Sequence, residues 1–200
     1  MDLTGQTVVV VGLGATGRDV AWFLARRGAR VRVTEAADSP SVRRAADELR
    51  RGGIEIEIGG HTDAFCREAS LVVTSPGVPP DVLPLRLACA AGIPVISEIE
   101  LAFRVSGHRR IIAVTGTNGK TTTTALIGHL LAEAGVPAVV CGNIGNTFIG
   151  EVDRLAPEMW AVVEVSSFQL EWVETFAPHI GVCLNITPDH LDRHASMEEY

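Results

Sequence analysis

The sequence predicts an α/β protein in which parallel strands alternate with helices, and three observations support this class. Short runs rich in Val and Ile alternate with longer amphipathic stretches along the chain. The apolar runs are nearly continuous, as is usual for parallel strands that helices cover on both faces. Two runs lead directly into a glycine-rich turn and then into a helical pattern, at residues 12–17 and 116–120. Such a series is typical of βαβ units.

The first half of the chain contains a full βαβ series. Strands are expected at residues 7–11, 31–34, 54–58, 71–74 and 94–96, and helices at 42–51 and 83–91. Another helix should pass through Val20 and Leu24 and end near Gly28, because apolar residues recur there at helical spacing before the glycine. We therefore predict a first α/β unit with a parallel sheet over residues 1–97.

The pattern restarts after residue 97, where a helix is expected to begin. This helix should cover residues 98–104, a longer one should cover 121–134, and strands are expected at 111–115, 138–141, 160–165 and 180–184. The leucines and the isoleucine of the longer helix should lie on one side of it. We expect this second unit, residues 98–200, to be incomplete at Tyr200, because so few strands rarely close an α/β domain.

The composition argues against several classes of function. Lysine and arginine number 17 against 24 aspartates and glutamates, a net charge of −7 that disfavours binding to long nucleic acid. No stretch approaches the roughly 18 apolar residues of a membrane helix, and the N-terminus shows no basic leader. Cys66, Cys89, Cys141 and Cys183 lie far apart, which suits free thiols in a reducing compartment. We expect a cytoplasmic monomer without nucleic-acid or membrane partners.

The second glycine turn carries the strongest chemical signal. Residues 111–122 read IIAVTGTNGKTT, so an apolar strand delivers a glycine loop to the start of a helix. The N–H groups and the dipole of a helix N-terminus favour phosphate, Lys120 can reach the β- and γ-phosphates, and the Thr121 hydroxyl is placed to bind Mg²⁺. Val114 stands where the usual P-loop has its first glycine, and Gly116 follows two residues later. We predict a phosphate-binding P-loop in the second unit, which begins at residue 98.

Glu164 is the second candidate, because it lies inside the apolar run 160–165. A carboxylate left unpaired in a buried strand would cost several kcal/mol. A cation such as Mg²⁺ at the end of the strand would remove this cost, and so would a neighbouring Lys or Arg.

The segment NITPDHLDRH at residues 185–194 is the third candidate. It follows the last expected strand, so His190 should lie at the edge where doubly wound sheets collect ligands. Standing alone, the segment would also fit a surface turn. His190 and His194 are spaced as in a zinc helix, but Pro188 breaks such a helix. An oxygen-rich set with one imidazole suits Mg²⁺, with Mn²⁺ as an alternative.

The first glycine turn is a weaker signal. Gly12, Gly14 and Gly17 follow the strand at residues 7–11, and Glu35 closes the next strand, as in the dinucleotide-binding fingerprint. This pattern is common, so it indicates only that a diphosphate can sit at the helix N-terminus. NAD is one candidate ligand.

Together these motifs and several others resemble the Mur ligases. In order along nearly all 200 residues they are VVVVGLGATG, TSPGVPP, SEIELAF, IIAVTGTNGKTTTTALIGHLL, CGNIGN, EVSSFQLE and LNITPDHLDRH. The resemblance is greatest to the member of the family that adds D-glutamate to UDP-N-acetylmuramoyl-L-alanine. It implies a Rossmann-like domain for the UDP-sugar, a central ATPase domain and a C-terminal domain for the amino acid. The last of these, and the family's carbamylated lysine, would lie past Tyr200, so these 200 residues alone should be inactive.

The resemblance also implies roles for individual residues, assigned by matching motifs. The implied catalytic residues are Lys120, Asn143, Glu164 and His190, and the implied metal ligands are Thr121, Glu164 and His190. The implied ATP-binding residues are Gly116, Thr117, Asn118, Gly119, Lys120, Thr121 and Thr122. The implied UDP-sugar-binding residues are Gly14, Ala15, Thr16, Glu35, Ser75, Gly77, Asn143, Ser166, Gln169 and His190. Ala36 and Ala37 stand where the family often has polar side chains near uracil.

The reaction implied by the resemblance is ATP-dependent ligation. The carboxylate of the terminal L-alanine would attack the γ-phosphate to give an acyl phosphate, and the amine of D-glutamate would then displace phosphate. Such a transfer depends mainly on positioning and charge neutralisation. Two alternatives stay open. A folate-polyglutamate-type ligase shares only the motifs from about residue 110. A nicotinamide-dependent dehydrogenase, or a nucleotide-binding regulatory module, would explain the first glycine turn but would give the second one no function.

Overall fold

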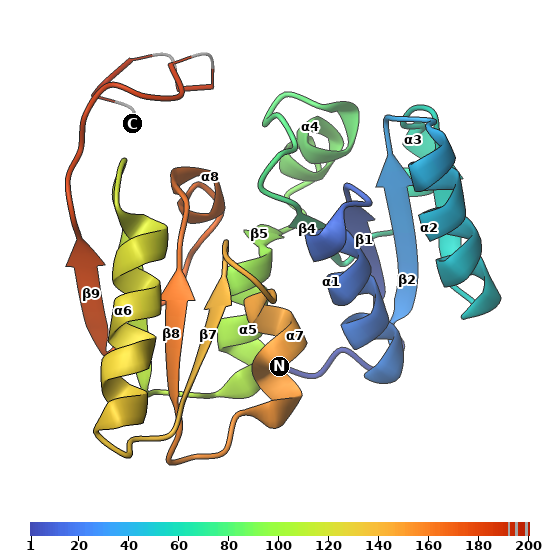
Figure 1. Cartoon of the computed structure of the whole chain (residues 1–200). Coiled ribbons are helices and arrows are strands. Elements are labelled where there is room, and N and C mark those ends of the chain that lie inside the picture. The colour runs from blue at the N-terminus through green and yellow to red at the C-terminus, as the bar shows by residue number, and fades with distance from the viewer. Residues whose placement is uncertain (192, 195, 199) are drawn as a thin grey trace.

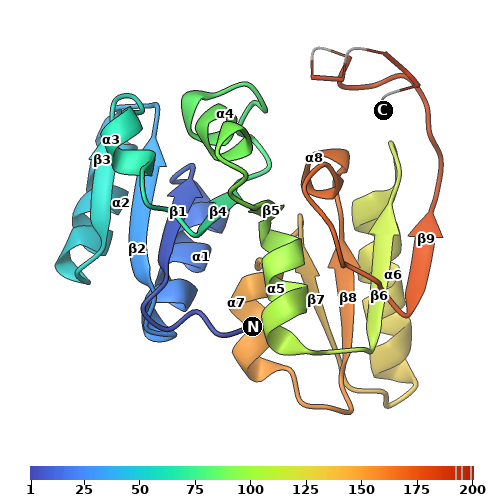
Figure 2. The same cartoon turned by 180° about the vertical axis from the view of Figure 1, so that it is seen from behind.

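The computed structural model describes residues 1–191, 193, 194, 196–198 and 200, and it contains two parallel sheets (Figures 1 and 2). The first sheet has the order β3-β2-β1-β4-β5 and the second has the order β7-β8-β6-β9. The strands are β1 (Thr7–Val11), β2 (Arg30–Glu35), β3 (Glu55–Ile58), β4 (Leu71–Thr74), β5 (Val95–Ser97), β6 (Ile111–Thr115), β7 (Ala138–Gly142), β8 (Trp160–Glu164) and β9 (Ile180–Cys183). Every strand pair is parallel, which confirms the predicted α/β class.

The first sheet has the strand order of a Rossmann-type fold, and its apolar strands are covered by helices. Its helices are α1 (Ala15–Arg26), α2 (Pro40–Arg51), α3 (Asp63–Cys66) and α4 (Leu83–Ala90). In the β1–β2 pair Val8 lies opposite Val31, and both side chains are buried. Helix α1 adds Phe23 and Leu24 to the same hydrophobic cluster. The apolar spacing that predicts this helix is therefore the face that it buries.

The second sheet carries helices α5 (Glu98–Ser106), α6 (Lys120–Glu133), α7 (Phe148–Glu151) and α8 (Ser167–Leu170), and a 3₁₀ turn at Val152–Arg154. Strand β6 lies between β8 and β9, with Val114 opposite Glu164 and Thr115 opposite Cys183. Because the strands are parallel, the segments that follow β6, β8 and β9 leave the sheet at the same edge. This edge collects most of the residues singled out in the second unit.

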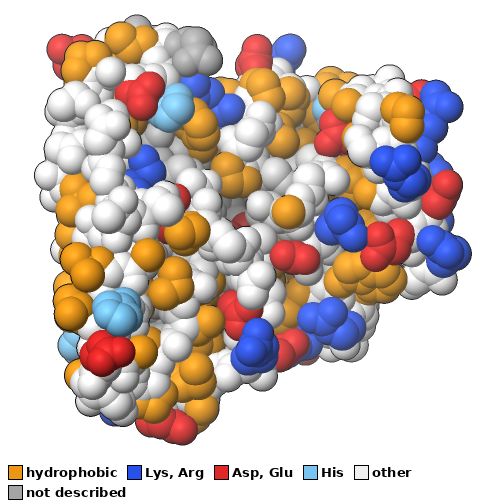
Figure 3. All heavy atoms as spheres, in the orientation of Figure 1, with side chains coloured by type: hydrophobic (Ala, Val, Ile, Leu, Met, Phe, Trp, Pro, Cys, Tyr) orange, Lys and Arg blue, Asp and Glu red, His pale blue; other side chains and the backbone are white. Residues whose placement is uncertain are grey.

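Some elements differ from the sequence prediction. Helices α3, α7 and α8 have four residues each, too few to show a helical period in the sequence. In α6, Ile127 and Leu131 pack against the second sheet, whereas Leu126 and Leu130 are 52% and 57% exposed. Figure 3 shows hydrophobic side chains over this part of the surface. The buried stripe of α6 is thus narrower than predicted. Within the described residues, no helix combines the length and apolar character that crossing a membrane would need.

The two units are joined without a linker, because β5 ends at Ser97 and α5 begins at Glu98. Helices α5 and α7 lie between the two sheets (Figure 1). One buried hydrophobic cluster contains Phe23 of the first unit together with Phe148 and Val163 of the second. The core is therefore continuous across the junction.

Polar contacts also cross the junction. The Ile149 N–H group donates to Glu98 Oε1 at 2.6 Å, and the Thr147 hydroxyl donates to Asp19 Oδ2 at 2.7 Å. Glu98 is fully buried, and this burial, with the nearby charge of Asp19, raises the pKa of its carboxyl to about 7 in spite of the backbone hydrogen bonds it accepts. Ionising Glu98 therefore works against the packing of α5 on α7.

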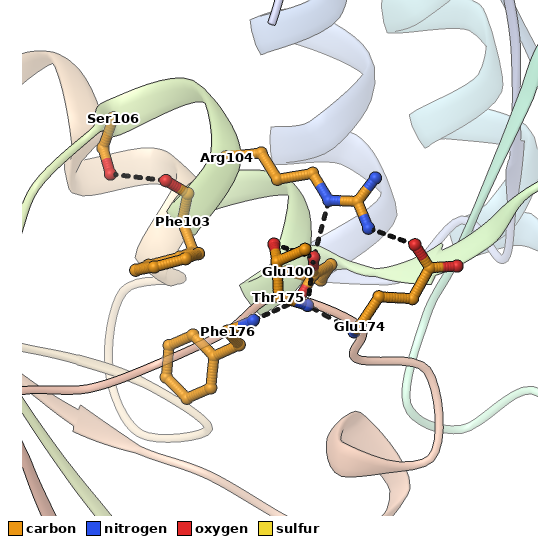
Figure 4. Close-up of polar contacts among 7 residues, drawn as sticks. All are labelled: Glu100, Phe103, Arg104, Ser106, Glu174, Thr175 and Phe176. Carbon is orange, nitrogen blue, oxygen red and sulfur yellow. Dashed lines mark hydrogen bonds and ion pairs between the residues drawn. The ribbon is translucent and has the colours of Figure 1, made fainter.

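Glu100, also on α5, anchors the segment that leads from α8 to β9 (Figure 4). Its buried carboxylate accepts hydrogen bonds from the N–H groups of Glu174, Thr175 and Phe176. The Thr175 hydroxyl and the Arg104 guanidinium donate to it at 2.6 Å each. Burial raises the pKa of Glu100, but these hydrogen bonds outweigh it and hold the pKa below the ordinary value of 4.5.

Replacing Glu100 by Gln should lower the free energy of unfolding at neutral pH by about 3 kcal/mol, because an amide would turn a donor toward the N–H groups. Since the pKa of Glu100 is depressed in the fold, its charge stabilises the protein above about pH 4.5. This contribution is lost as the pH falls through the folded pKa. Urea unfolding across this range should show wild type and Glu100→Gln converging in acid. A constant difference would contradict the assignment.

Candidate functional site

The loop between β6 and α6 places Lys120 at the first position of the helix. Gly116 has φ +136° and Gly119 has φ +85°, values that residues with side chains rarely adopt. A Cβ on Gly116 would also lie 3.1 Å from the backbone nitrogen and oxygen of Asn185. The Lys120 ammonium lies against the loop, donating to the carbonyls of Gly116 at 2.7 Å and Thr117 at 2.9 Å. The glycines are therefore required by the path of the backbone.

Glu164 lies at the end of β8, and its side chain is buried next to this loop. Its Oε2 accepts a hydrogen bond from the Thr121 hydroxyl at 2.8 Å, and its Oε1 accepts one from Asn143 Nδ2 at 2.9 Å. Both donors are neutral, so neither supplies the positive charge that would balance a buried carboxylate, and a cation could supply it. The structure thus brings together three of the predicted site residues, from β8, α6 and the loop after β7.

Gly142 allows Asn143 to reach this position. Gly142 has φ +102°, and a Cβ on it would lie 2.3 Å from the carbonyl oxygen of Glu164. The Asn143 N–H group donates to that carbonyl at 2.9 Å. The Gly-Asn pair therefore lets the loop after β7 approach the backbone of β8 closely.

His190 lines the same cavity as Lys120. The cavity has a volume of about 220 Å³, and Gly116, Ser167 and Ile186 also line it. The ring of His190 packs against Phe168 of α8, with ring centroids 4.9 Å apart. The backbone of His190 has φ +52°, an uncommon value outside glycine that often marks functional turns. His190 thus reaches the loop from the segment that follows β9.

Glu164 and Thr121 fit a magnesium ion. Mg²⁺ typically takes one or two protein oxygens and completes its shell with water and phosphate oxygens, so a large cluster of acids is not needed. Within the described ranges, no group of three or more His, Cys, Asp or Glu residues is arranged to hold a metal. His190 shares a cavity with Lys120, and its role as a metal ligand stays a prediction.

Ser166 and Gln169 cap helix α8. The Ser166 hydroxyl accepts from the Gln169 N–H group at 3.3 Å, and Gln169 Oε1 accepts from the Ser166 N–H group at 3.0 Å. Gln169 is buried, whereas its neighbour Phe168 packs on His190. Both capping residues therefore support the element that carries Phe168, and their contact with a substrate stays a prediction.

The loop between β1 and α1 forms a second candidate phosphate site. A Cβ on Gly12 would lie 2.9 Å from Ser75 Oγ, and a Cβ on Gly17 would lie 1.9 Å from the carbonyl oxygen of Gly12. Gly14 is the N-cap of α1, and a Cβ there would meet no atom within 4 Å. The start of a twelve-residue helix thus faces open space, where its N–H groups can receive a phosphate.

Glu35 supports this loop from the end of β2. One carboxylate oxygen accepts from the Leu13 N–H group and the other from the Ala37 N–H group, both at 2.8 Å. Glu35 therefore fixes the backbone, and its contact with a ligand stays a prediction. The other predicted residues of this unit lie at the start of α1 and in the turn after β4: Ala15, Thr16, Ser75 and Gly77.

The structure also brings in residues to which the sequence assigns no role. Phe168 packs on His190, and the Tyr200 hydroxyl lies 2.9 Å from Thr117 Oγ1. Asn185 forms hydrogen bonds to the backbone of Asn118. The position of Asn185 after an apolar strand could have indicated its place at the edge of the sheet. Phe168 and Tyr200 carry no such signal, because their contacts depend on tertiary packing.

Comparisons with protein families match both halves of the chain. Residues 6–97 match the Mur ligase MurD-like N-terminal domain, and residues 114–200 match the Mur ligase middle domain. A UDP-N-acetylmuramoylalanine--D-glutamate ligase of Pelotomaculum thermopropionicum is 47% identical over 199 residues, covering 100% of this chain and 44% of the relative. The ligase of the same name from Caldicellulosiruptor bescii is 46% identical over 200 residues, with the same coverage. The chain thus spans less than half the length of these curated relatives.

Solved structures of related enzymes share the fold. The UDP-N-acetylmuramate:L-alanyl-gamma-D-glutamyl-meso-diaminopimelate ligase of Neisseria meningitides aligns with a TM-score of 0.59 at 21% identity, over 98% of this chain and 65% of that one. The UDP-N-acetylmuramate-alanine ligase of Thermotoga maritima aligns with a TM-score of 0.56 at 24% identity, over 98% of this chain and 45% of that one. At this identity the matches establish the architecture alone.

Gly14 and Gly17, at the N-terminal end of α1, should respond differently to substitution by alanine. Gly17→Ala should lower the free energy of unfolding by about 3 kcal/mol, because the new Cβ would overlap the Gly12 carbonyl. Gly14→Ala should cost no more than about 1 kcal/mol, since the site is open and only the capping preference changes. Urea unfolding of the two variants measures both effects. Equal losses would show that the loop is built differently.

Proposed function

Because this chain belongs to the Mur ligase family, we propose that the gene product containing it is the ATP-dependent ligase that joins D-glutamate to UDP-N-acetylmuramoyl-L-alanine in peptidoglycan precursor synthesis. The observation that carries the proposal is the approach of Thr121 and Asn143 to the buried Glu164, beside the Lys120 loop. The match of residues 6–97 to a MurD-like N-terminal domain favours this ligase over a folate-polyglutamate-type enzyme.

The first unit, residues 1–97, binds the UDP-sugar in this proposal. Its diphosphate meets the N–H groups at the start of α1, where Gly14 leaves open space. The uridine side faces the turn after β4. These assignments rest on the open glycine turn and on the family of the domain. The residues assigned to this ligand in the first unit are Gly14, Ala15, Thr16, Glu35, Ser75 and Gly77.

The second unit, residues 98–200, is the first part of the ATP-binding domain in this proposal. The N–H groups at the start of α6 and the Lys120 ammonium bind the β- and γ-phosphates. Thr121, Glu164 and His190 would hold Mg²⁺, with Mn²⁺ as an alternative. When bound, the ion supplies positive charge to the phosphate oxygens. The nucleotide site uses residues 116–122, and Ser166 and Gln169 lie beside the acyl end of the UDP-sugar.

The proposed reaction has two steps. The carboxylate of the terminal L-alanine attacks the γ-phosphorus, the bond to ADP breaks, and an acyl phosphate forms. The amine of D-glutamate then attacks the acyl carbon, phosphate leaves, and an amide forms with loss of a proton. The Lys120 ammonium stabilises the negative charge that develops on the transferred phosphoryl group, while Asn143 and His190 orient the reacting carboxylate. The residues thus act by positioning and charge neutralisation.

A cytoplasmic location fits the thiols of the chain, and we propose it together with a monomeric state. All four cysteines are free in the structure. Burial raises the pKa of the Cys66 thiol to about 11 and that of Cys141 further still. Two of the thiols are therefore protected from oxidation as well as unpaired.

Thermal unfolding in the presence of nucleotides tests the first unit. UDP-N-acetylmuramoyl-L-alanine should stabilise the gene product, by about 2.7 kcal/mol at about 100 times Kd, and NAD should not. Gly14→Leu should remove this protection with little change in the Tm of the free protein, because the side chain would occupy the open space at the helix start. Protection by NAD and none by the UDP-sugar would reverse the choice of ligand.

Substitution of the charged residues tests the second unit. Glu164→Gln and Lys120→Ala should each lower the ligation rate by about 100-fold or more, because Lys120 supplies positive charge to the phosphates and Glu164 would hold the metal ion that does the same. Affinity for the UDP-sugar should stay within about twofold, since the first unit holds most of that ligand. Ligation assays with a Mg²⁺ titration, beside direct binding of the UDP-sugar, measure both quantities. Glu158→Gln is the matched control, because Glu158 is exposed. Wild-type rates in Glu164→Gln at equal Mg²⁺ would remove the metal assignment.

A further inference from the structure

The loop after β6 is hydrogen-bonded to the segment that follows β9. The Thr117 N–H group donates to the Asn185 carbonyl at 2.9 Å. The Asn185 side chain meets Asn118 twice: its Oδ1 accepts from the Asn118 N–H group at 2.9 Å, and its Nδ2 donates to the Asn118 carbonyl at 3.0 Å. Asn185 therefore pairs with Asn118 as a neighbouring strand would.

Thr117 makes a second connection two residues further along. The Thr187 N–H group donates to Thr117 Oγ1 at 2.9 Å, and the Thr117 hydroxyl reaches the Thr187 carbonyl at 3.2 Å. Gly116 lies so close to Asn185 that a Cβ would be 3.1 Å from its backbone. Loop and segment thus meet along residues 116–118 and 185–187, and the approach at Gly116 is too close for a side chain on that residue.

These bonds determine which N–H groups can meet a phosphate. The N–H groups of Thr117 and Asn118 point to Asn185, so they are already used. The first N–H groups of α6, which begins at Lys120, have no partner within the helix and are the ones left for an anion. The contact with residues 185–187 therefore sets the shape of the loop rather than adding to the phosphate contacts.

We propose that Asn185 and Thr117 are positioning residues, which lock the phosphate loop to the segment that carries His190. This inference rests on the proposed function of the loop as the ATP site. The bonds are neutral, so they do not compete with the charges of the nucleotide and are insensitive to salt. Because His190 is only three residues beyond Thr187, the lock also fixes the distance between the loop and the histidine that shares its cavity.

Binding of Mg·ADP to the gene product tests the lock. Thr117→Val and Asn185→Leu remove the polar groups at similar volume, and each should raise the Kd for Mg·ADP about tenfold, because the loop would lose its preformed shape. Thr117→Ser keeps the hydroxyl and should restore the wild-type Kd. In ligation assays the KM for ATP should rise, while the Kd for the UDP-sugar should not change.

A matched control separates positioning from a general loss of stability. Thr175→Val deletes a hydroxyl hydrogen bond of 2.6 Å to Glu100, away from the loop, so it should lower the Tm without changing the Kd for Mg·ADP. If Thr117→Val and Asn185→Leu bind Mg·ADP like wild type, or if Thr117→Ser fails like Thr117→Val, the lock is refuted. If the wild-type protein binds no Mg·ADP, the assignment of the loop as the ATP site is itself refuted.

Discussion

A buried carboxylate is costly unless its oxygens find hydrogen-bond partners, and Glu164 imposes that requirement on the second unit. Its two oxygens are met from opposite sides, by Thr121 at the start of α6 and by Asn143 after β7. Gly142 has to lack a side chain for the second approach to occur. The ends of β6, β7 and β8 are thereby drawn to a single point. The geometry of this edge follows from one acid in an otherwise apolar strand.

Helix α5 carries two buried glutamates that face different partners. Glu98 meets α7 in a setting that disfavours its charge, and Glu100 meets the segment after α8 in a setting that favours it. Both partners belong to the second unit, and α5 leads directly out of the last strand of the first. Helix α5 therefore joins the two units through two unlike contacts: both carboxylate oxygens of Glu100 are hydrogen-bonded, whereas one oxygen of Glu98 is buried without a partner among the described residues.

The sequence predicts most of the regular structure, because strands such as β1, β4 and β6 are apolar runs with glycine or proline at their ends. It also predicts that Thr121 and Glu164 meet, since both follow from the parallel arrangement of β6 and β8. It does not predict that the Glu35 carboxylate accepts hydrogen bonds from the backbone N–H groups of Leu13 and Ala37. Such contacts arise from where the chain turns after a strand, which residue patterns do not encode. The sequence does not predict the four-residue helices for a related reason, because capping and tertiary contacts set their position.

The absence of a linker between β5 and α5 has a consequence for the thermodynamics of ligand binding. Where two domains are tethered by a flexible segment, the local concentration of one site around the other is set by the length of the tether. Here β1 and β6, the strands that lead into the two loops, contribute to one hydrophobic cluster, so the packing of the core sets the separation of the loops before any ligand arrives. A ligand bound at one loop therefore keeps its other end within a small volume around the second loop. The translational and rotational entropy of association is then lost once for the whole ligand rather than separately for each end.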